Sequence, residues 1–200
     1  MPSYLPQSEL GPVDALAEHG WWLGSTLFGD EILQSLAAKA IDLAGSEVLS
    51  AAAVGRGVDK QQLAEIRQDK IQWIDSDSDA HREFFRVCDE LQESLNRGLY
   101  LGLNTVEAHY AHYSAGAFYQ RHIDSFKGAK NRMVSMVLYL NSDWQASHEG
   151  ELKLWDNGGV ELGCIAPRRG DVLLMLSEEM PHQVLPTTVD RYSIAAWFRC

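Results

Sequence analysis

Apolar residues in the first hundred positions recur at the spacing of an α-helix. The strongest stripe has its members at i, i+3, i+4, i+7 and i+11: Phe84, Val87, Cys88, Leu91 and Leu95. It predicts an amphipathic helix that is followed by Gly98. A weaker stripe lies earlier in the chain: Ile32, Leu33, Leu36 and Ile41. It predicts a second helix with Gly45 as its stop, and we expect both helices to brace a sheet.

The second hundred residues change to short runs rich in β-branched and aromatic residues. Seven of these runs predict strands: TVEAHYAHYS, NRMVSMVLYLN, GELKLW, VELGCIA, DVLLML, HQVLP and RYSIAAWF. Turn signals separate them at residues 156–159 (DNGG) and 167–170 (PRRG). Many short strands at this spacing are typical of a barrel or a double-sheet jelly roll.

The pattern contains no internal repeat and no low-complexity linker, so we expect a single domain over residues 1–200. Residues 1–100 would form a helix-rich support and residues 101–200 the β core. The expected fold class is therefore mainly β with flanking α: a jelly roll of the double-stranded β-helix (cupin-like) type, braced by N-terminal helices. Between the predicted helices, residues 51–70 form a long connection that ends in the short strand KIQWI. This connection is either a lid over a binding site or a surface excursion.

Composition and charge limit the classes of partner that we expect for this protein. The chain has 17 Lys and Arg against 28 Asp and Glu, a net charge of −11 that disfavours nucleic acid. No apolar run approaches the roughly 20 residues of a membrane span, and the N-terminus does not read as a secretory signal, so we expect no membrane partner. Three widely spaced cysteines, Cys88, Cys164 and Cys200, favour a reducing compartment and a cytoplasmic localisation.

The run YSAGAFYQRHIDSF offers a candidate metal site. His122 and Asp124 are two residues apart, so on a strand their side chains would share one face. His182 opens a predicted strand after a turn and is the natural third ligand. Two imidazoles and one carboxylate leave three positions open, an arrangement suited to non-haem Fe(II) that activates oxygen. An HxD pair alone is weak evidence, because surface residues often form one by chance.

The last predicted strand adds a second kind of evidence. Arg191, Ser193, Ala195 and Trp197 share one parity, so their side chains would point the same way. An arginine inside a barrel needs an anion, and its planar fork matches a carboxylate. A dicarboxylate cosubstrate would supply that anion and a second group to chelate a metal.

A longer motif ties these residues together as Y-x-x-G-x-x-Y-x-x-H-x-D: Tyr113, Gly116, Tyr119, His122 and Asp124. It resembles the prolyl hydroxylase branch of the 2-oxoglutarate/Fe(II) dioxygenases, and the later strands follow in the order of that family. The run EIRQDKIQWID is similar to the hypoxia-type prolyl hydroxylases and their bacterial relatives. The resemblance therefore extends from about Arg67 to Cys200.

The resemblance implies the cofactors Fe(II), 2-oxoglutarate and O2, with ascorbate as a further candidate. It implies His122, Asp124 and His182 as the iron ligands. Arg191 would bind the distal carboxylate of 2-oxoglutarate, and Tyr139 would add a hydroxyl to it.

The resemblance also implies residues around the cosubstrate and the substrate. Tyr113 would line the metal-binding end of 2-oxoglutarate, and Trp197 would form part of the substrate wall. Arg67 and Asp69 fall in the region that helps to cover a peptide substrate in the hypoxia-type enzymes. The chain departs from the family pattern in two places: at residues 149–150, where Glu-Gly replaces Gly-Gly, and at Ala195, where animal members carry a hydroxyl residue.

Other histidines are expected to be structural or exposed. His109 and His112 lie i, i+3 on a strand and would face opposite ways, one packed and one towards solvent. His81, in the first turn of a helix, is expected to be solvated. His19 and His148 are expected at the surface, and Cys200 is expected to be exposed.

The resemblance implies that the protein hydroxylates a prolyl residue at C4 in a protein or peptide, with succinate and CO2 as coproducts. A translation factor is the first candidate substrate. Two alternatives stay open: a 2-oxoglutarate oxygenase of small molecules or free amino acids, and a non-catalytic cupin-like binding module that holds zinc or no metal.

Overall fold

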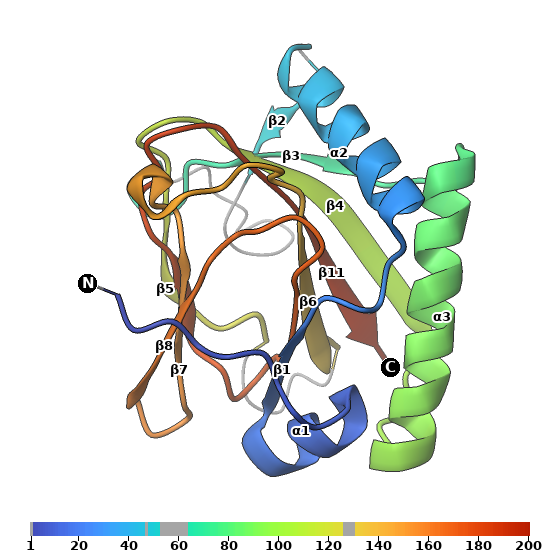
Figure 1. Cartoon of the computed structure of the whole chain (residues 1–200). Coiled ribbons are helices and arrows are strands. Elements are labelled where there is room, and N and C mark those ends of the chain that lie inside the picture. The colour runs from blue at the N-terminus through green and yellow to red at the C-terminus, as the bar shows by residue number, and fades with distance from the viewer. Residues whose placement is uncertain (1, 47, 53–63, 126–130) are drawn as a thin grey trace.

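The computed structural model describes residues 2–46, 48–52, 64–125 and 131–200, and Figure 1 draws them as ribbons. Two antiparallel sheets enclose the interior of the molecule, and helices flank the larger sheet (Figure 1). The architecture is the predicted mainly β fold with flanking α-helices. Most of the expected lid, residues 53–63, lies outside the described residues, so the lid stays a prediction.

The larger sheet has the order β1-β9-β6-β11-β4-β3-β2. Its strands are Trp21–Gly24 (β1), Val172–Leu176 (β9), Val134–Tyr139 (β6), Arg191–Arg199 (β11), Thr105–Tyr113 (β4), Lys70–Trp73 (β3) and Ser50–Ala51 (β2). The smaller sheet has the order β5-β10-β7-β8. Its strands are Tyr119–His122 (β5), His182–Val184 (β10), Leu152–Trp155 (β7) and Glu161–Ile165 (β8). The seven predicted strands are present, whereas the sequence pattern did not predict β1 or β2.

Three α-helices and one short 3-10 helix complete the described fold: α1 (Pro12–His19), α2 (Asp30–Ala44), α3 (Asp79–Leu99) and η2 (Ala146–His148). In Figure 1, α2 and α3 lie along the side of the larger sheet that faces away from the smaller one. Ser78 caps the N-terminus of α3, because its hydroxyl accepts a hydrogen bond of 3.2 Å from the backbone N–H of His81. None of the described helices is long and apolar enough to span a bilayer.

Two details of the predicted helices are wrong. Gly98 lies inside α3, which ends at Leu99 with Tyr100 in the left-handed conformation. A Cβ atom at residue 98 would lie 2.3 Å from Cγ1 of Val13, so this glycine permits the close approach of α1 rather than stopping α3. Ile41 is 57% exposed. The buried face of α2 consists instead of Leu33, Leu36, Ala37, Ala40 and Leu43, and Gly45 caps the helix as predicted.

The strands of the larger sheet present alternate residues to two different environments. One set packs in a core with the helices: Ala108, Tyr110, Val134, Leu138, Ile194, Ala196 and Phe198. The other set faces the smaller sheet, where a second core contains Leu23, Tyr139, Leu152, Leu154, Ile165, Leu173 and Met175. Period-2 alternation therefore separates a packing face from a face that lines the interior between the sheets.

Both predicted turns are confirmed. In the 156–159 hairpin, the N–H of Gly159 donates to the carbonyl of Asp156 at 3.0 Å, and Gly159 has φ 84. In the 167–170 turn, the N–H of Asp171 donates to the carbonyl of Arg168 at 3.1 Å.

A short segment before β3 joins the two sheets. Arg67 forms an antiparallel bridge with Tyr119 of β5. The N–H of Gln68 donates to the carbonyl of Phe118 at 3.0 Å, and the N–H of Gln120 donates to the carbonyl of Ile66 at 2.8 Å. Because β3 itself pairs with β4 of the larger sheet, residues 66–73 connect both sheets along one side.

His81 is buried, which corrects the expectation that it is solvated. Its Nε2 lies 2.9 Å from the hydroxyl of Tyr110, and its Nδ1 lies 2.7 Å from Oδ1 of Asp77. The first turn of α3 is directed at β4, so an imidazole there links the helix to the sheet.

Candidate metal centre and its pocket

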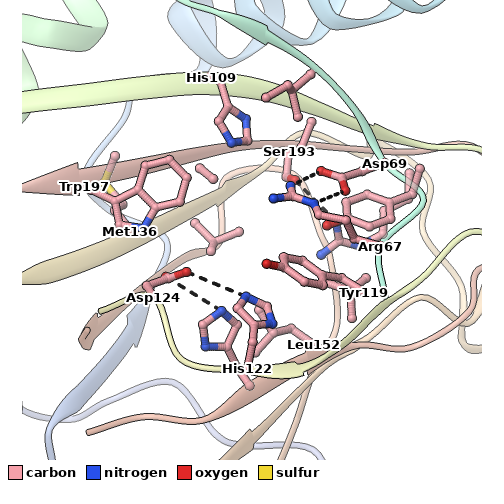
Figure 2. Close-up of a pocket in the computed structure, with 18 of the residues that line it drawn as sticks. Arg67, Asp69, His109, Tyr119, His122, Asp124, Met136, Leu152, Ser193 and Trp197 are labelled. Atoms are coloured by element: carbon pink, nitrogen blue, oxygen red, sulfur yellow. Dashed lines mark hydrogen bonds and ion pairs between the residues drawn. The ribbon is translucent and has the colours of Figure 1, made fainter. Parts of the chain in front are cut away.

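A cavity of about 870 Å³ lies between the two sheets, and most of the predicted site residues line it (Figure 2). Those that line it are Arg67, Asp69, Tyr113, His122, Asp124, His182, Arg191 and Trp197. Tyr139, the remaining one, is fully buried beside it, and the guanidinium carbon of Arg191 lies 5.3 Å from its ring. Residues that are far apart in sequence thus meet around one interior space.

The three predicted metal ligands come together at one end of the cavity. The Nε2 of His122 lies 3.6 Å from Oδ1 of Asp124, and the Nε2 of His182 lies 3.7 Å from Oδ2. Bonds of about 2.1 Å to one ion can span at most about 4.2 Å between two ligand atoms, so both separations fit. β5 ends at His122, so Asp124 follows the strand instead of lying on it as expected. His122 and His182 are paired across β5 and β10.

Both histidines have their Nδ1 next to a backbone carbonyl. The Nδ1 of His122 lies 2.8 Å from the oxygen of Gln120, and that of His182 lies 3.0 Å from the oxygen of Met180. When each Nδ1–H donates to its carbonyl, the Nε2 lone pair is left facing Asp124. This is the tautomer that metal-ligating histidines adopt.

The electrostatics of the cluster suit a cation. Burial lowers the pKa of His182 to about 4, so this imidazole is neutral at pH 7. Burial opposes the ionisation of Asp124, but His182, His122 and a hydrogen bond from Ser135 outweigh it and hold the pKa of Asp124 well below its usual range. An ionised carboxylate with two imidazoles is a donor set that Fe(II) accepts, so the residues fit such an ion.

Arg191 is buried without a carboxylate partner among the described residues. Its Nε donates to the carbonyl of Gly150 at 2.8 Å and its Nη1 to the hydroxyl of Ser193 at 3.3 Å, whereas Nη2 has no partner in the part of the chain that the structure describes. The hydroxyl of Tyr139 is also buried and has no partner among residues 2–46, 48–52, 64–125 and 131–200. The ring of Tyr113 lies 5.0 Å from the guanidinium carbon of Arg191. A buried cation without a counter-charge, next to hydrogen-bond donors without acceptors, forms an anion-binding site.

The backbone at residues 149–150 shapes this anion-binding site. Gly150 has φ 75, and a Cβ there would lie 2.8 Å from Cβ of Thr187 and 3.2 Å from Cδ of Arg191. Glu149 also has a positive φ of 54, which a non-glycine residue rarely adopts. The predicted departure from Gly-Gly therefore places a side chain on backbone that favours glycine.

Aromatic side chains form the wall near the cluster. Trp197 is buried, and its Nε1 has no hydrogen-bond partner within the described residues. The guanidinium carbon of Arg132 lies 3.7 Å from its ring centroid. His109 and Trp73 pack nearby, with the centroid of His109 5.2 Å from that of each tryptophan ring. Ala195 also lines the cavity, as its parity predicted.

Arg67 and Asp69 form a buried ion pair at the cavity wall. The Nε and Nη2 of Arg67 donate to the two carboxylate oxygens of Asp69 at 2.8 and 2.6 Å. Asp69 is 2% exposed, so this pair is part of the wall and not a loose surface contact.

Sequence reasoning missed two residues that touch the three candidate metal ligands. The hydroxyl of Ser135 donates to Oδ2 of Asp124 at 2.7 Å. Ser135 lies four residues before Tyr139 on β6, so strand alternation places both side chains on one face and could have identified it. Tyr119 stacks on His122 with centroids 3.6 Å apart and an interplanar angle of 15°. It was part of the quoted motif, but its direction depends on an irregularity of β5 that the sequence does not reveal.

The remaining histidines divide largely as expected. His109 is buried and faces the cavity, while His112 lies on the other face of β4. His112 is less solvated than predicted, because it stacks on Tyr192 and its Nε2 lies 2.9 Å from Oδ1 of Asp190. Cys200 is exposed, as predicted.

Comparison with known proteins identifies the class of this site. The family described as the 2OG-Fe(II) oxygenase superfamily matches residues 108–199. A Pseudomonas putida prolyl-4-hydroxylase is 38% identical, with 94% of this chain and 97% of that chain covered and a TM-score of 0.86. The chain belongs to the 2OG-Fe(II) oxygenase superfamily, whose members use Fe(II), 2-oxoglutarate and O2, and the fold is confirmed as a double-stranded β-helix.

Further relatives place it more narrowly. A Trichoplax adhaerens prolyl hydroxylase, solved in complex with a hypoxia inducible factor oxygen degradation domain peptide fragment, is 26% identical with a TM-score of 0.81, over 94% of this chain and 87% of that chain. Human Egl nine homolog 1 is 26% identical over 93% of this chain, which spans 45% of that protein. The chain thus covers about half of this curated relative. These likenesses are to enzymes of the prolyl hydroxylase type, the class that the motif resembled.

Proposed function

We propose that this protein hydroxylates a prolyl residue at C4 in a protein or peptide. One oxygen atom of O2 would enter the C–H bond, and the other would enter 2-oxoglutarate, which would lose CO2 and become succinate. The observation that carries the proposal is the buried guanidinium of Arg191, which has no carboxylate partner among the described residues and lies in the cavity that also holds the ligand cluster. The hydroxyl of Tyr139, likewise without a partner in the described protein, is buried beside it. Likeness to a bacterial prolyl-4-hydroxylase supports the prolyl substrate.

His122, Asp124 and His182 would hold the iron. Fe(II) bound there would supply the redox chemistry that activates O2. Ser135 keeps the Asp124 carboxylate oriented through its hydrogen bond of 2.7 Å. The two backbone carbonyls next to the Nδ1 atoms keep the Nε2 atoms of both imidazoles directed at the site.

Arg191 and Tyr139 would bind the distal carboxylate of 2-oxoglutarate. Nη2 of Arg191 and the Tyr139 hydroxyl are both donors without a partner among the described residues, so together they match the acceptor oxygens of one carboxylate. Tyr113, whose ring lies 5.0 Å from the Arg191 guanidinium carbon, would line the other part of the cosubstrate.

The substrate would occupy the side of the cavity between Trp197 and the Arg67–Asp69 pair. Trp197 offers an apolar ring surface next to the metal cluster, which suits a pyrrolidine ring. Arg67 and Asp69 belong to the region expected to cover a peptide. A translation factor in the cytoplasm stays the first candidate substrate, and ascorbate stays a candidate auxiliary reductant.

The test measures succinate in the presence of Fe(II), 2-oxoglutarate and a proteome extract, with mass spectrometry to find prolyl residues that gain one oxygen. Wild-type protein should form succinate and modify a target, and His122→Ala should abolish both. His19→Ala, which changes an exposed histidine of α1, is the matched control and should behave as wild type. Undiminished turnover by His122→Ala would refute the ligand assignment.

Substrate panels separate the alternatives. Hydroxylation of free proline or another small molecule, with no modified protein, would favour a small-molecule oxygenase. Binding of zinc without 2-oxoglutarate affinity would favour a cupin-like binding module. Arg191-dependent binding of 2-oxoglutarate excludes the latter, because such a module needs no buried guanidinium.

A further inference from the structure

The aromatic ring of Tyr119 lies flat on the imidazole of His122, although the two residues are three apart on β5. Their centroids are 3.6 Å apart and their planes differ by 15°. On a regular strand, residues i and i+3 point to opposite faces. Here His122 is opposite His182 while Tyr119 is opposite Val184, so β5 has one more residue than β10 in this interval. Such a bulge re-aims side chains and brings both rings to one face.

The other face of Tyr119 is covered by Arg67. The guanidinium carbon lies 4.3 Å from the ring centroid, a cation–π contact. Arg67 is itself fixed by its two hydrogen bonds to Asp69. Asp69, Arg67, Tyr119 and His122 therefore follow one another in a continuous series of contacts, and Figure 2 shows Tyr119 between the arginine and the histidine.

The backbone holds these side chains in register. Arg67 and Tyr119 form the antiparallel bridge that ties the segment before β3 to β5. The flanking hydrogen bonds, from Gln68 to Phe118 and from Gln120 to Ile66, lie on either side of that bridge. The side-chain contact and the backbone pairing thus act on the same pair of residues.

His122 needs such support more than His182 does. The side chain of His122 is 17% exposed, against 7% for His182. The Nδ1 contact to Gln120 fixes one edge of the His122 ring but leaves its face to neighbouring side chains. Metal affinity depends on how well the ligands are oriented before the ion binds.

We propose that Tyr119 is a positioning residue that fixes the plane of the His122 imidazole, and that the Arg67–Asp69 pair clamps Tyr119 from its other face. The inference rests on the proposed metal site. It makes the pairing of residues 66–68 with β5 a condition for a fully formed ligand cluster. The position of the Arg67–Asp69 ion pair would then affect metal affinity. This effect is separate from any contact that the two residues make with substrate.

The test uses Co(II) as the probe, with affinity measured by calorimetry and ligand geometry by the visible absorption of the bound ion. Tyr119→Ala should weaken Co(II) binding about tenfold and change the spectrum, a typical loss for a residue that orients a ligand. Tyr119→Phe should keep the Co(II) affinity and the spectrum of the wild type, because the stacking ring remains. Arg67→Ala should weaken binding about threefold, since the ring loses only its outer support.

Arg121→Ala is the matched control. Arg121 lies on the same strand, one residue before His122, and its guanidinium carbon lies 4.4 Å from the ring centroid of Trp155, almost the geometry of the Arg67–Tyr119 pair. Its Co(II) affinity and spectrum should match wild type. Tyr119→Leu, which keeps apolar volume, replaces Tyr119→Ala in the same assay if the alanine variant does not fold.

Wild-type affinity and spectrum in Tyr119→Ala or Tyr119→Leu would overturn the inference, as would an equal loss in Arg121→Ala. A loss in Tyr119→Phe as large as in Tyr119→Ala would also overturn it, because the hydroxyl and not the stacked ring would then matter. Co(II) binding requires no turnover. A wild-type protein that binds Co(II) but forms no succinate refutes the proposed function alone, whereas an active wild type with an unaffected Tyr119→Ala refutes this inference alone.

Discussion

The two faces of β11 share one backbone and are both largely buried, yet they differ in whether their polar atoms are satisfied. Ile194, Ala196 and Phe198 face the helices and carry no polar side-chain atoms. Arg191 and Trp197 face the cavity, and each leaves one buried nitrogen without a partner among the described residues. Folded proteins seldom leave such groups unmatched. The first face therefore stabilises the fold, and the second is arranged to meet a ligand.

The largest expected effect comes from the helix-side face. Phe198→Ala should lower the free energy of unfolding by about 3–5 kcal/mol, because it leaves a cavity in the core. The protein that remains folded should bind 2-oxoglutarate normally when loaded with Co(II). Urea denaturation and calorimetry measure the two quantities. Strong loss of 2-oxoglutarate affinity in folded Phe198→Ala would remove the distinction between the faces.

The next effect lies on the cavity side. Arg191→Met should weaken 2-oxoglutarate binding at least about 100-fold, since a desolvated charge-assisted contact is lost. The free energy of unfolding should stay the same or rise, because an unbalanced buried charge is removed. Arg168→Met, which changes an exposed arginine near Trp144, is the control for calorimetry and denaturation. Unchanged 2-oxoglutarate affinity in Arg191→Met would contradict the assigned role.

A paired substitution sharpens the comparison further. Tyr139→Phe should weaken 2-oxoglutarate binding about tenfold and leave stability unchanged, because its hydroxyl has no partner in the described protein. Tyr110→Phe should do the reverse, lowering the free energy of unfolding by about 1 kcal/mol, because its hydroxyl lies 2.9 Å from Nε2 of His81. Urea denaturation measures the free energy of unfolding, and calorimetry measures 2-oxoglutarate affinity. Equal changes of these two quantities in Tyr139→Phe and Tyr110→Phe would contradict the prediction.

The smallest effect tests how tightly the helix side is packed. Gly98→Ala should lower the free energy of unfolding by about 1 kcal/mol, although alanine favours helices by about as much, because the added methyl meets Val13. Adding Val13→Ala should remove the clash, so that the double variant recovers stability relative to the sum of the single variants. A gain in thermal stability from Gly98→Ala alone would show that α1 can move away without cost.

Much of the cavity side could be predicted from the sequence because strand alternation is a property of the backbone itself. The parity of Arg191 and Trp197 on β11 was sufficient to place both in one cavity. The cluster of His122, Asp124 and His182 followed from spacing together with the family resemblance.

The errors arose where direction depends on distant parts of the chain. The stack of Tyr119 on His122 requires the bulge between β5 and β10, which local sequence does not encode visibly. His81 turns inward because the Tyr110 hydroxyl offers it a partner across the helix–sheet boundary. A glycine such as Gly98 can end a helix or admit a neighbour, and only the position of Val13 distinguishes the two.

The glycine at residue 150 limits how the end of the pocket proposed to bind the distal carboxylate can be redesigned. Its carbonyl accepts from Arg191, and the arginine stem passes where a side chain at residue 150 would lie. A longer or shorter diacid therefore cannot be selected by exchanging the arginine alone, because the space above the glycine changes with it. Engineering of cosubstrate choice has to treat the two positions as one unit.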